Sequence, residues 1–96
     1  MKVRFTRRAL GDLAGIDNYI RQDSPTVASE VIARLIERAR QLADNPLQGR
    51  ATDEFPARVI IEPRLRYLIF YTIDGDDIQI THIRHTSRRR PAGWNR

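Results

Sequence analysis

The stretch that most constrains the fold is RLRYLIFYTI, at positions 64–73, because it is apolar along most of its length. Successive side chains of an extended strand point to opposite faces of the sheet. One face of this strand would carry Tyr67, Ile69, Tyr71 and Ile73. The other face would carry Leu68 and Phe70. A strand that is apolar on both sides needs cover on both faces of its sheet, so the chain must supply two layers or leave one face to a partner.

The segments before this strand have the period of amphipathic helices. The first helix is predicted to begin after Thr6, a good capping residue, and to run to about Gln22. Its apolar face carries Leu10, Leu13, Ile16 and Ile20. A second helix is predicted to begin at Ser24-Pro25 and to end near Asn45. Its apolar stripe contains Val27, Val31, Ile32, Leu35, Ala39 and Leu42. The turn between the helices is so short that they must form an antiparallel hairpin.

Strands are predicted at positions 1–5, 57–61, 64–73 and 77–85, with a loop over 46–56. The Asp74-Gly75 pair between the last two strands is a strong signal for a β-hairpin. The resulting order, β-α-α-β-β-β, predicts an α+β fold over residues 1–96, a single domain with a mainly antiparallel sheet and the helical hairpin on one face.

One helical hairpin can cover only one face of this sheet. On the other face, Val59 and Ile61 extend the apolar surface of Leu68 and Phe70. Two interpretations remain open for this surface. Either the loop and the tail fold over it, or it forms a groove that a partner fills.

The net charge of the chain is concentrated at its C-terminal end. The chain carries +5, and Arg84, Arg88, Arg89, Arg90 and Arg96 alone provide five positive charges without an acidic neighbour. The 12 remaining basic side chains balance the 12 acidic ones. Residues 86–96 therefore read as a basic tail that can steer the protein toward a phosphate-rich or acidic partner. Trp94 in this tail could stack on a base or pack back on the domain.

Composition and spacing exclude several other classes of protein. The chain has no cysteine, no signal-peptide pattern and no apolar run near the roughly 20 residues that span a bilayer, so we expect a cytoplasmic protein without membrane contact. His82 and His85 are three positions apart on one strand, and this odd difference sends them to opposite faces. We therefore predict no metal site and no cofactor. Asp74, Asp76 and Asp77 fit turn chemistry.

Arg84, His85 and Arg88 form the one constellation with potential polar function. A nuclease needs a base, an acid and cations that stabilise the phosphate transition state, and His85 and Arg88 could supply part of this set. The alternative is a solvated strand end.

The chain resembles a known family over nearly its whole length. The similar segments are FTRRALGDLAGIDNYI, the helix exit LADNPLQGR, the strand RYLIFYTI and the end IQITHIRHTSRR. In the last segment His85 and Arg88 match a His-x-x-Arg signature. Together these segments resemble toxins of the RelE/ParE superfamily, from bacterial type II toxin–antitoxin modules, whose fold agrees with the one predicted above.

The resemblance implies one of two activities. RelE-like toxins cleave messenger RNA on the ribosome with basic side chains on the open sheet face, whereas ParE-like toxins inhibit DNA gyrase and lack that set. In an ungapped alignment, the RelE-type basic positions fall on Val59, Ile61 and Leu68, and only Arg88 matches a basic catalytic position. We therefore expect the ParE-like branch, a gyrase inhibitor rather than an enzyme. The alternatives are a RelE-like endonuclease using His85 and Arg88, or a non-toxic member that only binds its antitoxin.

The resemblance also implies partners and surfaces. The expected partners are a cognate ParD-like antitoxin, in a hetero-oligomer, and DNA gyrase, in a module of the plasmid-stabilisation type. The expected target-binding residues are Arg84, His85, Arg88, Arg89 and Arg90. The expected antitoxin-binding residues are Val59, Ile61, Leu68 and Phe70. Two positions depart from the pattern: family members often have Arg in place of His82 and Asp in place of Arg89.

Overall fold

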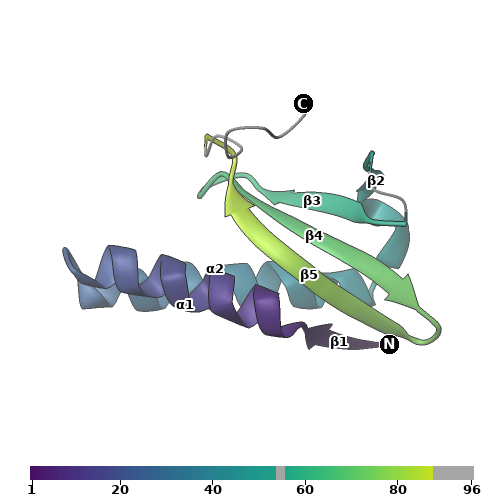
Figure 1. The fold of residues 1–96 in the computed structure, drawn as a ribbon, viewed down its shortest axis with the longest axis horizontal. Helices are drawn as coiled ribbons and strands as arrows, with labels where there is room; N and C mark the ends of the chain where they lie inside the picture. Colours follow the sequence, from purple (N-terminus) through teal and green to yellow (C-terminus); the bar gives the residue numbers. More distant parts are fainter. Residues whose placement is uncertain (54–55, 88–96) are drawn as a thin grey trace.

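The computed structural model describes residues 1–53 and 56–87 (Figure 1). The helical elements are α1 (Arg7–Arg21), α2 (Pro25–Arg40) and the short 3-10 turns η1 (Gln41–Ala43) and η2 (Pro46–Gln48). The strands are β1 (Lys2–Phe5), β2 (Arg50–Ala51), β3 (Arg58–Glu62), β4 (Tyr67–Asp74) and β5 (Asp77–His85). The predicted α+β fold is confirmed.

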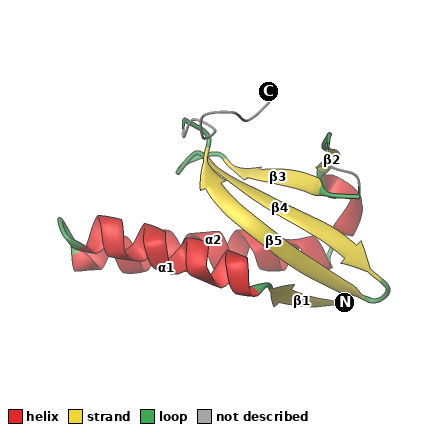
Figure 2. Cartoon of the chain, in the orientation of Figure 1, coloured by secondary structure: helices red, strands yellow, loops and turns green. Residues whose placement is uncertain are grey.

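Both long helices begin at the predicted caps. The Thr6 hydroxyl accepts a hydrogen bond of 3.1 Å from the Ala9 N–H, and the Ser24 hydroxyl accepts one of 3.2 Å from the Val27 N–H. Pro25 occupies the first turn of α2, where its missing N–H leaves no gap in the helix. The two helices form the predicted antiparallel hairpin, which lies along one face of the sheet (Figure 2).

The sheet has five strands in the order β1-β5-β4-β3-β2. β1 runs parallel to β5, and the other pairs are antiparallel. The predicted loop over 46–56 contains η2 and the two-residue strand β2, which pairs with Arg58 and Val59. The predicted strand 64–73 starts only at Tyr67, because Arg66 adopts a left-handed φ of 62° that turns the chain from β3 into β4.

The core lies between the helical hairpin and one face of the sheet. Its largest fully buried side chains are Tyr71, Leu35, Leu42, Ile69, Ile78 and Ile80. Each aliphatic side chain buried in this way contributes about 1.5–3 kcal/mol to folding. The strand face that carries Ile69 and Tyr71 is thus the one that the helices cover, as the alternation predicts.

Tyr71 also connects the sheet to the segment that follows η1. Its hydroxyl donates a hydrogen bond of 2.6 Å to the Pro46 carbonyl and accepts one of 2.9 Å from the Gly49 N–H. Gly49 lies so close that a Cβ atom there would be 2.5 Å from the Tyr71 oxygen. The absence of a side chain at Gly49 is therefore required by close approach.

The outer side of β5 is closed beyond the end of β1. The Thr6 hydroxyl donates to the Thr81 carbonyl at 3.0 Å, and an Asp12 carboxylate oxygen accepts the Ile83 N–H at 2.9 Å. Residues of the first helix region thus take the place of a neighbouring strand along this part of the sheet edge.

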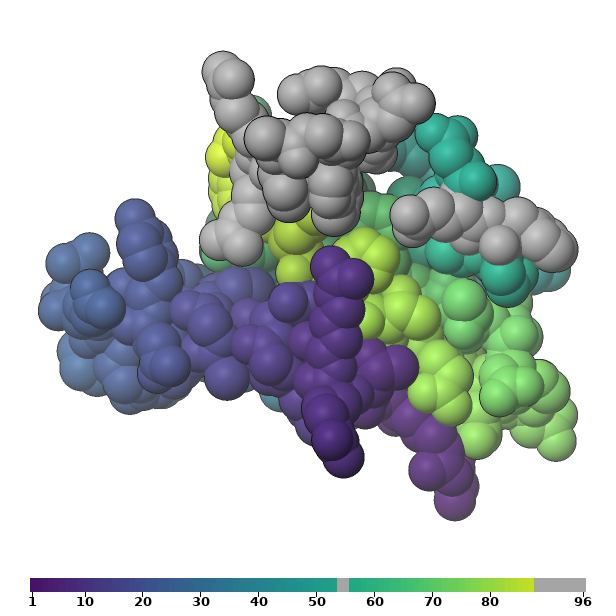
Figure 3. Space-filling model, in the orientation of Figure 1, coloured from purple at the N-terminus to yellow at the C-terminus, as the bar shows by residue number. Residues whose placement is uncertain are grey.

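The turn end of the helical hairpin projects past the sheet (Figures 1 and 3). Tyr19 near the end of α1 is 76% exposed, and Val27 near the start of α2 is 45% exposed. Neither described helix has the length and apolarity needed to cross a bilayer.

Candidate functional site

The sheet face opposite the helices, here called the open face, carries a four-residue apolar patch. The register of β3 against β4 places Val59 opposite Phe70 and Ile61 opposite Leu68. Because directly paired residues share a face, these four side chains form one continuous surface. The geometry therefore brings together the residues that the sequence suggested for antitoxin binding.

Basic groups of β5 flank this patch. His82 pairs with Phe70, and Arg84 pairs with Leu68. The His82 ring stacks on the Phe70 ring with centroids 4.1 Å apart, and the Arg84 guanidinium lies 5.5 Å from the centroid of the same ring. Phe70 is only 9% exposed and Val59 only 6% exposed, whereas Ile61 is 43% exposed. A ligand on the open face therefore meets Ile61 first, with Phe70 already in contact with a histidine and an arginine.

His85 lies on the other face of the sheet. It pairs with Tyr67, and the two rings meet edge to face with centroids 5.0 Å apart. Its Nδ1 accepts the Ser87 N–H at 3.1 Å and lies 2.7 Å from the Ser87 hydroxyl oxygen. Since Nδ1 accepts a backbone N–H, the ring proton is on Nε2 in this arrangement.

The two histidines diverge, as their spacing predicts. The same alternation separates Arg84 from His85, because neighbouring residues of β5 point to opposite faces. The structure thus turns the side chains of two members of the constellation that the sequence suggested to opposite faces, although both residues border one cavity beside α1. Its third member, Arg88, lies outside the described residues, as do Arg89, Arg90 and Trp94.

His85 borders a cavity of about 290 Å³ beside α1. Gly11 and Gly15 of α1 form part of its wall, together with Tyr67 of β4 and Asp12. The Asp12 carboxylate already holds the Ile83 N–H. His85 therefore faces a helix surface rather than the open face where basic groups of β5 gather.

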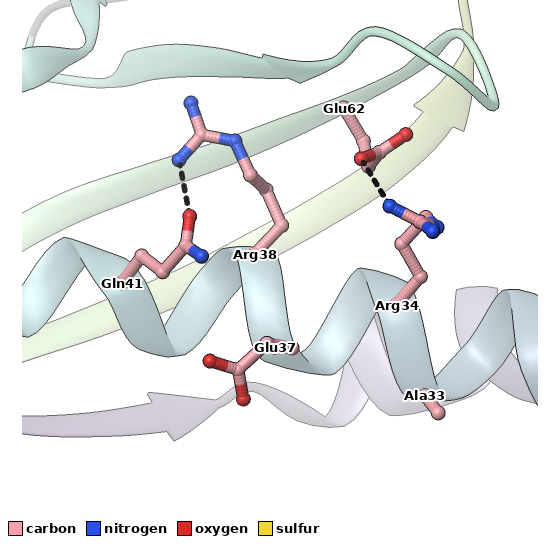
Figure 4. A pocket seen from close by; sticks show the side chains of 6 residues that line it. All are labelled: Ala33, Arg34, Glu37, Arg38, Gln41 and Glu62. Atoms are coloured by element: carbon pink, nitrogen blue, oxygen red, sulfur yellow. Dashed lines mark hydrogen bonds and ion pairs between the residues drawn. The ribbon is translucent and has the colours of Figure 1, made fainter.

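A second polar cluster joins α2 to the end of β3 and was not predicted from the sequence (Figure 4). Glu62 is only 5% exposed; its carboxylate accepts the Leu65 N–H at 2.9 Å and lies 3.7 Å from an Arg34 nitrogen. Arg38 donates from Nε to the Ile61 carbonyl at 3.0 Å and from Nη1 to Gln48 Oε1 at 3.0 Å. A buried glutamate almost always has a partner. The sequence around Glu62 does not show which helix supplies that partner, so the cluster could not be predicted.

The electrostatics on α1 are local. Arg21 donates two hydrogen bonds to the Asp17 carboxylate, at 3.0 and 2.7 Å, and these bonds lower the pKa of Asp17. The same contact raises the pKa of Arg21. Since both groups are ionised at neutral pH in any case, the pair supports the helix and gives no acid or base for chemistry.

Comparisons with known proteins agree with this geometry. The family model described as "ParE toxin of type II toxin-antitoxin system, parDE" matches residues 3–90. Toxin RelE2 of Caulobacter vibrioides is 39% identical over 88 residues, covering 91% of this chain and 97% of that protein. The Y4kP protein of Sinorhizobium fredii is 32% identical over 90 residues, covering 94% and 93%.

The structural comparison gives the same result. The solved structure of the chromosomal ParDE TA system from P. aeruginosa superposes with a TM-score of 0.79 at 25% sequence identity, covering 88% of this chain and 95% of the solved one. Together with the family match over residues 3–90, this places the chain in the ParE toxin family of type II toxin–antitoxin systems, within the RelE/ParE superfamily.

Proposed function

We propose that this toxin acts in the cytoplasm by inhibiting DNA gyrase, and that its cognate antitoxin neutralises it by covering the open face. The observation that carries this proposal is the apolar patch. Val59, Ile61 and Leu68 lie side by side at the positions where a RelE-like toxin of this fold carries cations.

A ribonuclease mechanism requires groups that converge on one phosphate. A base must take a proton, an acid must give one, and cations must stabilise the extra negative charge, each of these cations being worth about 3–4 kcal/mol. His85 lies on the helix side of the sheet, and the four side chains of the apolar patch carry no charge themselves, although Arg84 lies beside them. This separation supports inhibition by binding over catalysis.

One arrangement favours the endonuclease alternative and must be tested with it. His82 and Arg84 both contact the Phe70 ring on the open face, so an imidazole and a guanidinium lie next to each other there. A similar protein also bears the name RelE2. If the chain were a nuclease, His82 and Arg84, rather than His85, would be the catalytic groups within the described residues.

Two assays on the purified toxin separate the candidate functions. We expect the protein to inhibit supercoiling by gyrase and to leave messenger RNA on translating ribosomes intact, with or without added divalent metal. Inhibition by binding needs no acid or base. The wild-type toxin and His82→Ala should therefore both leave the RNA uncut. Site-specific cleavage that disappears in His82→Ala or Arg84→Ala would establish the endonuclease instead. Inactivity in both assays, with antitoxin binding retained, would indicate a non-toxic member.

The proposed role of the apolar patch predicts the effect of Phe70→Ala on antitoxin affinity. The substitution removes the ring on which His82 and Arg84 rest. Because Phe70 itself is only 9% exposed, the loss of affinity comes from the displacement of these two side chains and of the surface around them. We expect the Kd for the antitoxin to rise by roughly 10- to 100-fold, as measured by calorimetry with the folded variant. Ile73→Ala is the control, because Ile73 is on the opposite strand face near the end of β4. Unchanged affinity in Phe70→Ala would place the antitoxin elsewhere.

A further inference from the structure

The outer edge of β3 is only partly paired. β2 pairs with Arg58 and Val59, and beyond them β3 has no neighbouring strand among the described residues. The Ile61 carbonyl points outward and accepts the Arg38 Nε at 3.0 Å. In a strand the N–H of a residue points to the same side as its carbonyl. The Ile61 N–H therefore also points outward, and no residue in the described part of the chain accepts it.

Two cavities border this edge, one on each side of the sheet. The first, of about 390 Å³, lies on the helix side between α2 and the end of β3, where Arg34, Glu37 and Glu62 line it (Figure 4). The second, of about 270 Å³, lies on the open side and is lined by Ile61, Leu68 and Arg50 among others. Arg38 belongs to the walls of both.

We propose that an extended segment of the antitoxin binds here as an additional strand along positions 60–62 of β3. Side chains of an added strand alternate between the two sides of a sheet, so they would enter the two cavities in turn. The proposal rests on the antitoxin partner of the toxin family and is independent of the identity of the toxin's target.

The walls of the cavities specify the chemistry of that segment. On the open side, the exposed Ile61 and the half-buried Leu68 select apolar side chains. On the helix side, Arg34 and Arg38 project from one face of α2, four residues apart. Glu62 is already held by the Leu65 N–H and by Arg34, which leaves Arg38 as the cation that meets an incoming group. The segment should therefore alternate apolar and acidic residues.

Arg38 would change its hydrogen-bond partners when the added strand binds. In the free toxin its guanidinium holds the Ile61 carbonyl and two side-chain amides, those of Gln41 at 3.3 Å and Gln48 at 3.0 Å. These are bonds to neutral acceptors, and a carboxylate is a stronger acceptor for a guanidinium. An added strand thus supplies a backbone N–H to the Ile61 carbonyl and an acidic side chain to the arginine that it releases.

Proline at position 61 tests the backbone contact directly. Ile61→Pro removes the outward N–H, which takes no part in the pairing of β3 with β4, so the sheet should tolerate it. Ile61→Ala is the matched control, since it loses the side chain but keeps the N–H. The probe is the antitoxin encoded beside the toxin gene, titrated against the full chain by calorimetry. We expect Ile61→Pro to raise the Kd at least 10-fold above that of Ile61→Ala. Equal Kd values for the two variants would overturn the proposal.

Amide exchange gives a reading that does not depend on the proline variant folding. In the wild-type toxin, the Ile61 N–H should exchange freely and become protected at least 100-fold in the antitoxin complex. Arg38→Gln, which removes the charge, should weaken binding in low salt more than in high salt. An Ile61 N–H that stays unprotected in the complex would overturn the proposal. Protection of that N–H in free toxin at high concentration, together with dimerisation, would assign the edge to a second copy of the chain and would also overturn it.

Discussion

Gly49→Ala should destabilise this toxin more than alanine at any other glycine that the structure describes. The added Cβ would be 2.5 Å from the Tyr71 hydroxyl oxygen and 2.7 Å from its Cε1, and Tyr71 is fully buried, so its ring has no free space to move into. Overpacking of this kind costs about 1–3 kcal/mol, and displacing the hydroxyl from the Gly49 N–H adds about 1–3 kcal/mol. We expect the free energy of unfolding, measured by urea denaturation, to fall by roughly 2–6 kcal/mol, the sum of these two costs.

Gly15→Ala provides the matched control. Gly15 is in α1, and no atom lies within 4 Å of a Cβ built there. Alanine at a helical position is better than glycine by about 0.5–1 kcal/mol, so this variant should be more stable than the wild type. Tyr71→Phe should reduce the cost of Gly49→Ala without removing it, because the ring carbons remain too close. Similar melting temperatures for Gly49→Ala and Gly15→Ala would show that the segment around Gly49 moves away at little cost.

Arg88→Ala should abolish gyrase inhibition if the proposed function is right. Arg88 lies outside the described residues, but the chain is held up to the position before it. The Thr86 N–H donates to the Arg66 carbonyl at 2.8 Å, and the Ser87 N–H donates to His85. A cation that follows a fixed backbone can make a specific contact, whose loss costs about 2–5 kcal/mol. We expect the inhibitory concentration in a supercoiling assay to rise at least about 30-fold at every salt concentration.

Truncation after Arg88 distinguishes the specific contact of Arg88 from the long-range electrostatic attraction of the remaining tail arginines. Arg89, Arg90 and Arg96 are expected to act at a distance, through a field that salt screens over about 8 Å at physiological ionic strength. The truncated toxin should therefore be weaker mainly in low salt and approach the wild type as salt is added. A loss as large as that of Arg88→Ala at all salt concentrations would mean that the removed arginines make contacts of their own.

Local signals made most of the fold predictable. The caps at Thr6 and Ser24 and the Asp74-Gly75 turn act within a few residues, so they can be read without knowing the rest of the molecule. The faces of β4 followed from alternation alone. The strand β2 was missed because two residues have no detectable period, and Arg50 is in a strand only because it pairs with Val59.

The candidate site was predictable only where alternation decides it. The shared face of the apolar patch and the divergence of His82 from His85 both follow from a period of two. Alternation from the buried Ile80 would have placed His82 and Arg84 on the helix side. The shift in register of β5 against β4 next to Phe70 turns both to the patch instead, and the sequence gives no sign of this shift. The cluster of Arg34, Arg38 and Glu62 depends on how α2 crosses the sheet, and local sequence does not encode that crossing.

The closed side of β5 limits how many chains can join this sheet. On that side the sheet ends in a four-residue strand that carries Lys2 and Arg4, and beyond it Asp12 has taken the Ile83 N–H. A filament can grow by strand pairing only when each copy has two free sheet edges, so that each edge pairs with a different neighbouring copy. Among the residues that the structure describes, only β3 offers such an edge. Toxin molecules that lose their antitoxin therefore cannot polymerise through their sheets, and each should remain competent to be captured again.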